Sequence, residues 1–188
     1  MSYRAVVIGV SAGGMRAMAE VLSGLSGDFG LPILVVQHVS RDSNGYLAKH
    51  LSEKGTLEVL EAEDKTPIMP GKVFLAPPNY HMLVGDEDSL VLSVDGHVNF
   101  ARPSVDVLFE SAAEVYGSGL IGIILTGAND DGSRGLAEIA AAGGVVVVQD
   151  PESAEVDSMP RAALEKVPSA KVMKLKEISE FLMQLQER

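Results

Sequence analysis

The chain has 188 residues, 46% of them hydrophobic, which is typical of a folded globular protein and not of a disordered one. Its net charge of −11 argues against nucleic acid and anionic membrane surfaces as general partners. The absence of cysteine excludes disulfides, thiol catalysis and cysteine-based zinc sites. There is no signal-peptide pattern and no apolar run of the ~20 residues that a membrane span needs, so we expect a cytoplasmic protein without membrane insertion.

Buried strands and amphipathic helices alternate along the chain. Short apolar runs predict strands at residues 3–10, 32–37, 56–60, 120–125 and 145–149. Helical spacing of apolar residues predicts helices at 15–25, 45–54, 104–116, 135–142 and 175–186. Between them, short strands at 72–76, 81–84 and 89–94 with intervening turn signals predict an antiparallel insert. The pattern predicts a single α/β domain over 1–188, a doubly wound, mostly parallel sheet with helices on both faces and a β-hairpin insert.

The first strand ends in the segment G-V-S-A-G-G, which holds Ser11 between glycines at a strand-to-helix turn. This is the context of a nucleophile elbow, and unpaired N–H groups of the following helix could stabilise an oxyanion. From this turn alone, a catalytic serine and an inert serine in a tight connection are about equally favoured. A phosphate-binding loop is disfavoured, because Ser11 replaces the second glycine of the dinucleotide pattern and no Lys-Ser/Thr pair follows.

Two further polar groups follow other strands of the predicted sheet. His38 ends the second strand, and Asp130 and Asp131 follow the strand at 120–125. Since the carboxyl ends of parallel strands meet at one edge, Ser11, His38 and one of these aspartates could form a Ser-His-Asp triad. Both aspartates remain candidates, and an Asp before Gly at a helix start is also a common helix cap.

The other histidines are weaker candidates. His50 lies within a predicted helix, His97 follows a glycine turn and is expected to be exposed, and His81 could approach the site from the insert. These histidines are scattered and show no H-x-x-x-H spacing, so we predict no metal and no cofactor.

Four arginines lie in or just after the loops at the expected active edge. They could form a basic rim that receives an acidic substrate, although arginine is also common in such loops. They are Arg16, Arg41, Arg102 and Arg134.

Several segments together resemble the catalytic domain of the CheB-type chemotaxis receptor protein-glutamate methylesterases. They are I-G-V-S-A-G-G, V-V-Q-H-V, P-G-K-V-F-L-A-P, Y-H-M, R-P-S-V-D-V-L-F, G-I-I-L-T-G-A-N-D-D-G and M-P-R-A-A. The resemblance implies an α/β fold and hydrolysis of γ-glutamyl methyl esters on methyl-accepting chemotaxis receptors, with glutamine deamidation in some members. It assigns Ser11 as the nucleophile, His38 as the base and, by the position before the last glycine of its T-G-M-G-x-D-G motif, Asp131 as the acid.

On this basis we expect Ala12, Gly13, Gly127 and Ala128 to contribute to oxyanion or substrate binding, with Arg102 as a further substrate contact. Two features depart from the family. Its Met and Gly in the T-G-M-G-x-D-G loop are here Ala128 and Asn129, and Asn tolerates the left-handed conformation better than most residues.

The second departure is the receiver domain that usual members carry before the catalytic domain. This chain starts at the catalytic strand, so we expect a stand-alone catalytic domain, for which a separate response regulator is a candidate partner. Two rival functions stay open. One is a serine hydrolase of the same fold acting on a different ester or amide, and the other is a non-catalytic binding module.

Overall fold

The computed structural model describes residues 2–38 and 45–186, and seven of its strands form one sheet. The strands are β1 (Ala5–Val10), β2 (Ile33–Gln37), β3 (Glu58–Glu61), β4 (Lys72–Leu75), β7 (Leu120–Ile124), β8 (Val145–Gln149) and β9 (Lys171–Met173). They lie in the order β3-β4-β2-β1-β7-β8-β9, and every neighbouring pair is parallel. All six β1 residues are buried, as expected for a central strand covered on both faces.

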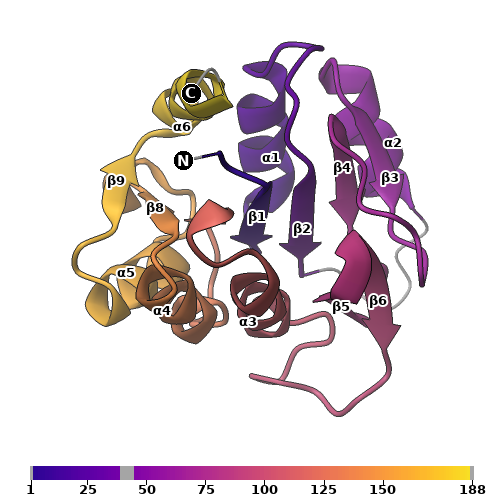
Figure 1. Cartoon of the computed structure of the whole chain (residues 1–188). Coiled ribbons are helices and arrows are strands. Elements are labelled where there is room, and N and C mark those ends of the chain that lie inside the picture. Colours follow the sequence, from indigo (N-terminus) through magenta and orange to yellow (C-terminus); the bar gives the residue numbers. More distant parts are fainter. Residues whose placement is uncertain (1, 39–44, 187–188) are drawn as a thin grey trace.

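Helices cover both faces of this sheet (Figure 1). One face carries α1 (Gly14–Ser23), α2 (Tyr46–Lys54) and α6 (Leu175–Gln186), whose buried residues join Val6 and Ile8 of β1 in one core. The other carries α3 (Val105–Tyr116), α4 (Ser133–Ala141) and α5 (Ser158–Lys166), which pack with Val7 in a second core. Short 3-10 turns lie at Asp86–Asp88, Gly117–Gly119 and Pro151–Ser153. The predicted fold class is therefore confirmed.

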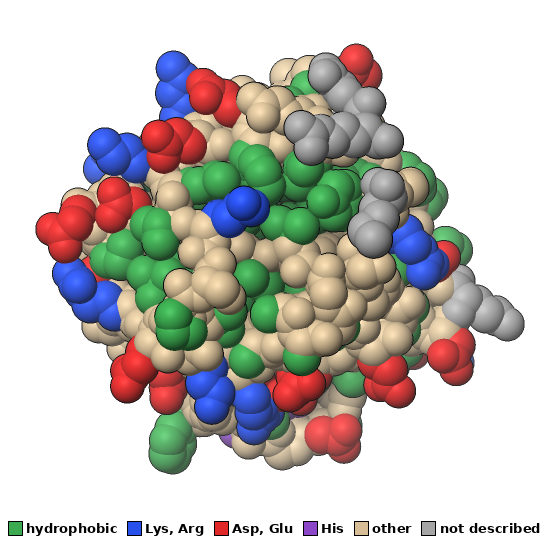
Figure 2. Space-filling model, turned by 60° about the vertical axis from the view of Figure 1, so that its left-hand side comes forward, with side chains coloured by type: hydrophobic (Ala, Val, Ile, Leu, Met, Phe, Trp, Pro, Cys, Tyr) green, Lys and Arg blue, Asp and Glu red, His purple; other side chains and the backbone are tan. Residues whose placement is uncertain are grey.

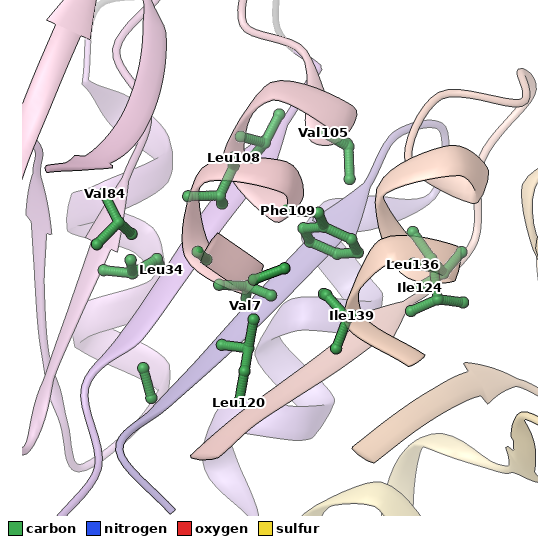
Figure 3. Packing of buried hydrophobic residues seen from close by; sticks show 14 of the residues in the cluster. Val7, Leu34, Val84, Val105, Leu108, Phe109, Leu120, Ile124, Leu136 and Ile139 are labelled. Carbon is green, nitrogen blue, oxygen red and sulfur yellow. The ribbon is translucent and has the colours of Figure 1, made fainter. Parts of the chain in front are cut away.

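The second core is built around α3. Phe109 is fully buried, and Figure 3 shows its ring among the labelled side chains of the sheet and of α4. A Cβ at Gly135 of α4 would lie 2.5 Å from the Phe109 Cβ, so glycine lets the two helices approach closely. This close packing fixes the start of α3, which reaches the functional edge of the sheet.

The antiparallel insert is smaller than predicted. Only β5 (His81–Gly85) and β6 (Ser89–Ser93) form a hairpin, which packs on α3 through a hydrogen bond from Val84 N to Ser111 Oγ of 3.0 Å. The run at 72–76 was wrongly assigned to the insert, since β4 lies in the main sheet between β2 and β3 and is parallel to both. A short apolar run looks the same in either setting, because pairing partners are not local in sequence.

Two elements near the C-terminus were not predicted. Helix α5 carries Pro160 at its third residue, where a missing N–H is tolerated, although a proline there weakens the sequence signal for a helix. Strand β9 has three residues at the edge of the sheet, and its Val172 is 50% exposed.

Figure 2 shows hydrophobic side chains gathered across the middle of one face, with acidic and basic side chains around its outline. Over the described residues, no helix is long and apolar enough to cross a membrane.

Candidate active site

Ser11 lies in a tight turn between β1 and α1 at the carboxyl edge of the sheet. Its backbone N–H donates to Thr126 O at 2.9 Å, which ties the turn to the loop after β7. Gly13 has a φ of +78°, a value that favours glycine. At Gly14, a Cβ would lie 1.9 Å from the Gln37 Oε1, so glycine leaves room for the Gln37 side chain beside the start of α1. The turn glycines thus bring Ser11 up to the end of β2.

His38 follows β2 and contacts Asp131 from the loop after β7. The His38 Nε2 and the Asp131 Oδ2 are 2.8 Å apart, and the Asp131 side chain is 0% exposed. Asp130 is exposed. The structure therefore distinguishes the two aspartates that sequence reasoning left open, and brings Asp131 to the histidine. The amide of Gln37 donates from Nε2 to Ser11 O at 2.9 Å and to His38 O at 3.2 Å, linking the two turns.

The Asp131 carboxylate lies at the N-terminus of α3, not on the helix that follows it in sequence. Helix α4 has Gly132 as its N-cap, and the side chain that accepts from its first turn is Asp106, whose Oδ1 lies 2.7 Å from Gly135 N, so a simple capping role of Asp131 at α4 does not apply. Instead, Asp131 accepts hydrogen bonds of 2.7–3.1 Å from the start of α3 and the loop before it. The donors are Ser104 Oγ, Val105 N, Asp106 N and Asn99 Nδ2.

Two opposing effects set the pKa of Asp131. Burial by itself raises the pKa, but the hydrogen bonds from His38, Val105, Asn99 and Asp106 outweigh it and hold the pKa below its ordinary value. The N-terminus of α3 adds partial positive charge at the same place. Asp131 is therefore an ionised acceptor, and its partner His38 carries the proton of their contact on Nε2.

Asn129 lies between the serine and the histidine. Its Nδ2 is 3.4 Å from Ser11 Oγ and 3.0 Å from His38 Nδ1, and its Oδ1 accepts from Asp131 N at 3.0 Å. Asn129 is not among the described non-glycine residues with positive φ, so a left-handed tolerance is not why asparagine stands here. The sequence identifies Asn129 as a departure from the T-G-M-G-x-D-G motif but contains no signal for its contacts with Ser11 and His38.

The expected oxyanion donors divide into two groups. The Gly127 N–H donates to Val156 O at 3.0 Å, so it is already occupied. A Cβ at Gly127 would lie 3.0 Å from the Ser11 Cβ and 2.4 Å from Met159 Sδ, which makes this glycine a point of close approach. Ala12, which follows Ser11, and Ala128, in the loop after β7, are both exposed. Gly13 is the N-cap of α1.

The three described arginines of the predicted rim occupy different settings. Arg16 lines the hollow that contains Ser11 and His38. Arg102 Nη1 is instead held by the carbonyls of Val94 and Asp95 at 2.8 and 3.0 Å, and Arg134 pairs with Glu110. Arg41 lies outside the described residues.

The remaining histidines occupy three different settings. His50 lines the Ser11 hollow together with Glu155, and its ring stacks on Tyr46 with centroids 5.6 Å apart. His81 is 1% exposed and does not reach the site directly. Its Nδ1 accepts from Ser104 N and its Nε2 lies 2.9 Å from Gly96 O, so it supports the Asp131 pocket from behind. His97 is exposed, as expected. In the described ranges, no group of three His, Asp or Glu side chains is arranged so that it could hold a metal ion.

The comparisons with known proteins agree with this architecture. The chain aligns with the crystal structure of the Thermotoga maritima CheB methylesterase catalytic domain at a TM-score of 0.94 and 34% identity, over 98% of this chain and 100% of that one. A Leptospira interrogans protein named for protein-glutamate methylesterase and protein-glutamine glutaminase activities is 47% identical over 100% of this chain and 97% of its own length. The Myxococcus xanthus protein-glutamate methylesterase FrzG is 41% identical, and the match spans 54% of its length.

Fold and relatives together define an enzyme of the protein-glutamate methylesterase class. The model of the CheB methylesterase family matches residues 6–182, and the chain belongs to that family. The resemblance found in the sequence motifs is thereby confirmed.

Proposed function

We propose that this protein hydrolyses γ-glutamyl methyl esters on the cytoplasmic helices of chemoreceptors, releases methanol, and also deamidates glutamine at such sites. The observation that carries the proposal is the 2.8 Å contact between His38 and the buried Asp131 carboxylate, because His38 also lines the same hollow as Ser11. This is the arrangement of a base oriented by an acid next to a nucleophile. Membership of the CheB methylesterase family supports a methyl ester as the substrate.

In the mechanism, His38 Nδ1 accepts the proton of Ser11 Oγ as that oxygen attacks the ester carbonyl. The ionised Asp131 stabilises the imidazolium through Nε2–H. His38 then donates its proton to the departing methoxide oxygen, which leaves as methanol. Water hydrolyses the remaining acyl-serine with His38 again as base, leaving glutamate. With a glutamine substrate, ammonia is the leaving group in the same sequence.

The developing oxyanion needs donors that other groups do not already hold. We assign this role to the N–H groups of Ala12, the residue before the N-cap of α1, and of Ala128, because the Gly127 N–H donates to Val156. Arg16 in the same hollow is the basic group best placed for an acidic substrate. The proposed reaction takes place in the cytoplasm, where a separate response regulator would be the partner that controls it.

Methanol and ammonia release from a methylated, glutamine-containing chemoreceptor fragment test the substrate and the nucleophile together. Ser11→Ala should lower methanol release by about 10⁴-fold or more, as removal of a triad member does. Ser23→Ala, the same change at the last residue of α1, is the matched control and should keep the wild-type rate.

The outcomes separate the rival functions. Methanol release that depends on Ser11 supports the proposal. Hydrolysis of p-nitrophenyl esters without methanol release from the receptor would instead indicate a serine hydrolase with another substrate. No hydrolysis of either substrate would favour a binding module.

A further inference from the structure

The Asn129 carboxamide occupies the space in which proton transfer between Ser11 and His38 has to occur. Its Nδ2 contacts His38 Nδ1 at 3.0 Å and Ser11 Oγ at 3.4 Å. Within the described residues, the Ser11 Oγ hydrogen bond runs to this amide and not to His38. The resting arrangement is therefore a bridge from the amide to both reacting groups.

The direction of the amide follows from its other end. Asn129 Oδ1 accepts from the Asp131 N–H at 3.0 Å, so a flipped amide would place its NH₂ against that N–H donor. The oxygen therefore faces Asp131 N, and Nδ2 faces the serine and the histidine. The donor character of Asn129 toward His38 is set by the loop itself.

The acceptor character of His38 Nδ1 follows from its partner on the opposite side. Because the ionised Asp131 only accepts, Nε2 holds the ring proton and Nδ1 presents its lone pair. Asn129 donates into that lone pair. The proton of Ser11 must reach the same lone pair, and the imidazolium N–H that results would face the N–H donors of the amide. The observed contact thus favours the neutral ring and opposes its protonation.

We propose that Asn129 is a positioning residue that restrains the His38 base in the resting enzyme, and that its carboxamide must withdraw before Ser11 can be activated. The restraint rests on the proposed function of Ser11 and His38. The Asn129 side chain carries the same carboxamide group as a glutamine substrate, so an entering ester or amide group would compete with it for the same space. Removing the carboxamide should therefore make the serine more reactive.

A test that needs no receptor is the rate at which a fluorophosphonate probe labels Ser11. In that reaction the Oγ–H bond breaks, the proton passes to His38 Nδ1, Oγ bonds to phosphorus, and the P–F bond breaks to release fluoride. Asn129→Ala removes the carboxamide. Asn129→Ser also removes it but keeps a hydroxyl able to accept from Asp131 N, so it preserves the turn. Asp130→Ala changes the exposed neighbour and serves as the matched control.

Both Asn129 variants should label about two- to tenfold faster than wild type, the range expected for loss of one net hydrogen bond. In the pH dependence of the labelling rate, the fall in rate on the acidic side should also move to higher pH in these variants, because the Asn129 amide stabilises only the neutral His38 ring. The charged or titratable groups that face His38 are unchanged in all variants: Asp131 in contact with it, and Arg16, His50 and Glu155 lining the hollow. Asp130→Ala should match wild type in rate and in pH dependence.

Rates at or below wild type in both Asn129 variants would overturn the restraint. Faster labelling whose pH dependence matches wild type would also overturn the restraint, because a loosened loop alone could speed up labelling. Wild-type labelling that survives Ser11→Ala or His38→Ala would overturn the proposed function as well. Labelling that needs both residues but ignores Asn129 would overturn the restraint alone.

Discussion

At the scale of single residues, the Asp131 carboxylate organises the candidate site. It collects donors from His38, the loop before α3 and the first turn of α3, all while fully buried. The positions of Ser11, His38 and an aspartate after predicted strands were enough to predict that they lie at one edge of the sheet, because the carboxyl ends of parallel strands share that edge. They could not separate Asp130 from Asp131, nor place Asn99 and Asn129. Those contacts depend on loop conformations and side-chain directions that no local pattern specifies.

The two aspartates give a matched pair of substitutions. Asp131→Asn should lower methanol release by about 10⁴-fold, because the ionised partner that orients and stabilises the His38 imidazolium is lost. Asp130→Asn should change it little, since that side chain is exposed. Steady-state methanol release from the receptor fragment measures both. Equal impairment in the two variants, or a larger loss for Asp130→Asn, would reject the assignment of Asp131.

The lowered pKa of Asp131 also predicts how stability depends on pH. A carboxyl with a folded-state pKa below its ordinary value of 3.8 stabilises the fold above that value. This contribution is lost as the pH falls through the folded-state pKa. Urea unfolding between pH 7 and pH 3 should show a smaller acid loss in Asp131→Asn than in wild type. A variant that loses stability as steeply as wild type would contradict the assignment.

Asp106 is expected to act with the opposite sign. Burial raises its pKa above 3.8, with the charge of Asp131 adding to the effect and the hydrogen bond from Gly135 opposing it. Its ionised form therefore destabilises the fold near neutral pH, and this cost is relieved as the pH falls through the raised pKa. The acid loss assigned to Asp131 is consequently a net effect of two neighbouring carboxyls, which is why the variant comparison is needed.

At the scale of elements, the site depends on how closely β1 approaches the start of α3. Apolar runs predicted the central strands and most helices, because buried parallel strands and amphipathic helices have strong local patterns. Strand β4 was misassigned and α5 was missed, since a four-residue strand has no distinctive length and Pro160 weakens the helix signal. Sheet order also had no local signal. The approach of Gly9 in β1 to Val105 in α3 joins residues far apart in the sequence, so it has no local signal either.

Gly9→Ala should destabilise the protein and reduce activity together. The added Cβ would lie 2.2 Å from Val105 Cγ1, and the Val105 N–H donates to Asp131, so the clash is transmitted to the site. Overpacking of this kind costs about 1–3 kcal/mol. Gly27→Ala is the control, because its nearest described neighbour is Thr56 Cβ at 3.8 Å. Chemical unfolding should show a loss for Gly9→Ala only; equal stability in both variants would refute the packing argument.

At the scale of the whole molecule, the net charge of −11 bears on the proposed substrate, because receptor methylation helices are rich in glutamate and would repel the enzyme. Long-range repulsion between like-charged molecules slows association and is screened by salt, with a Debye length of ~8 Å at physiological ionic strength. Arg16, in the Ser11 hollow, is the cation placed to offset this repulsion locally. Arg102 and Arg134 are engaged elsewhere.

Arg16→Glu should therefore raise KM for the receptor fragment roughly threefold to tenfold at low salt, with a smaller increase at high salt. Lys72→Glu makes the same charge change at the first residue of β4, at the opposite edge of the sheet, and controls for net charge. Initial rates of methanol release at several salt concentrations measure both. A KM increase of the same size in the two variants would assign the effect to total charge and not to Arg16.

We propose that Ser11, His38 and Asp131 act as one catalytic unit, and the sharpest test is a double-mutant comparison of the first two. Methanol release is measured for Ser11→Ala, His38→Ala and the double variant. Members of one unit are strongly non-additive, so the double variant should be no slower than Ser11→Ala within about threefold. Losses that multiply, so that the double variant falls by the product of the two single effects, would show that Ser11 and His38 act independently and would rule out the triad.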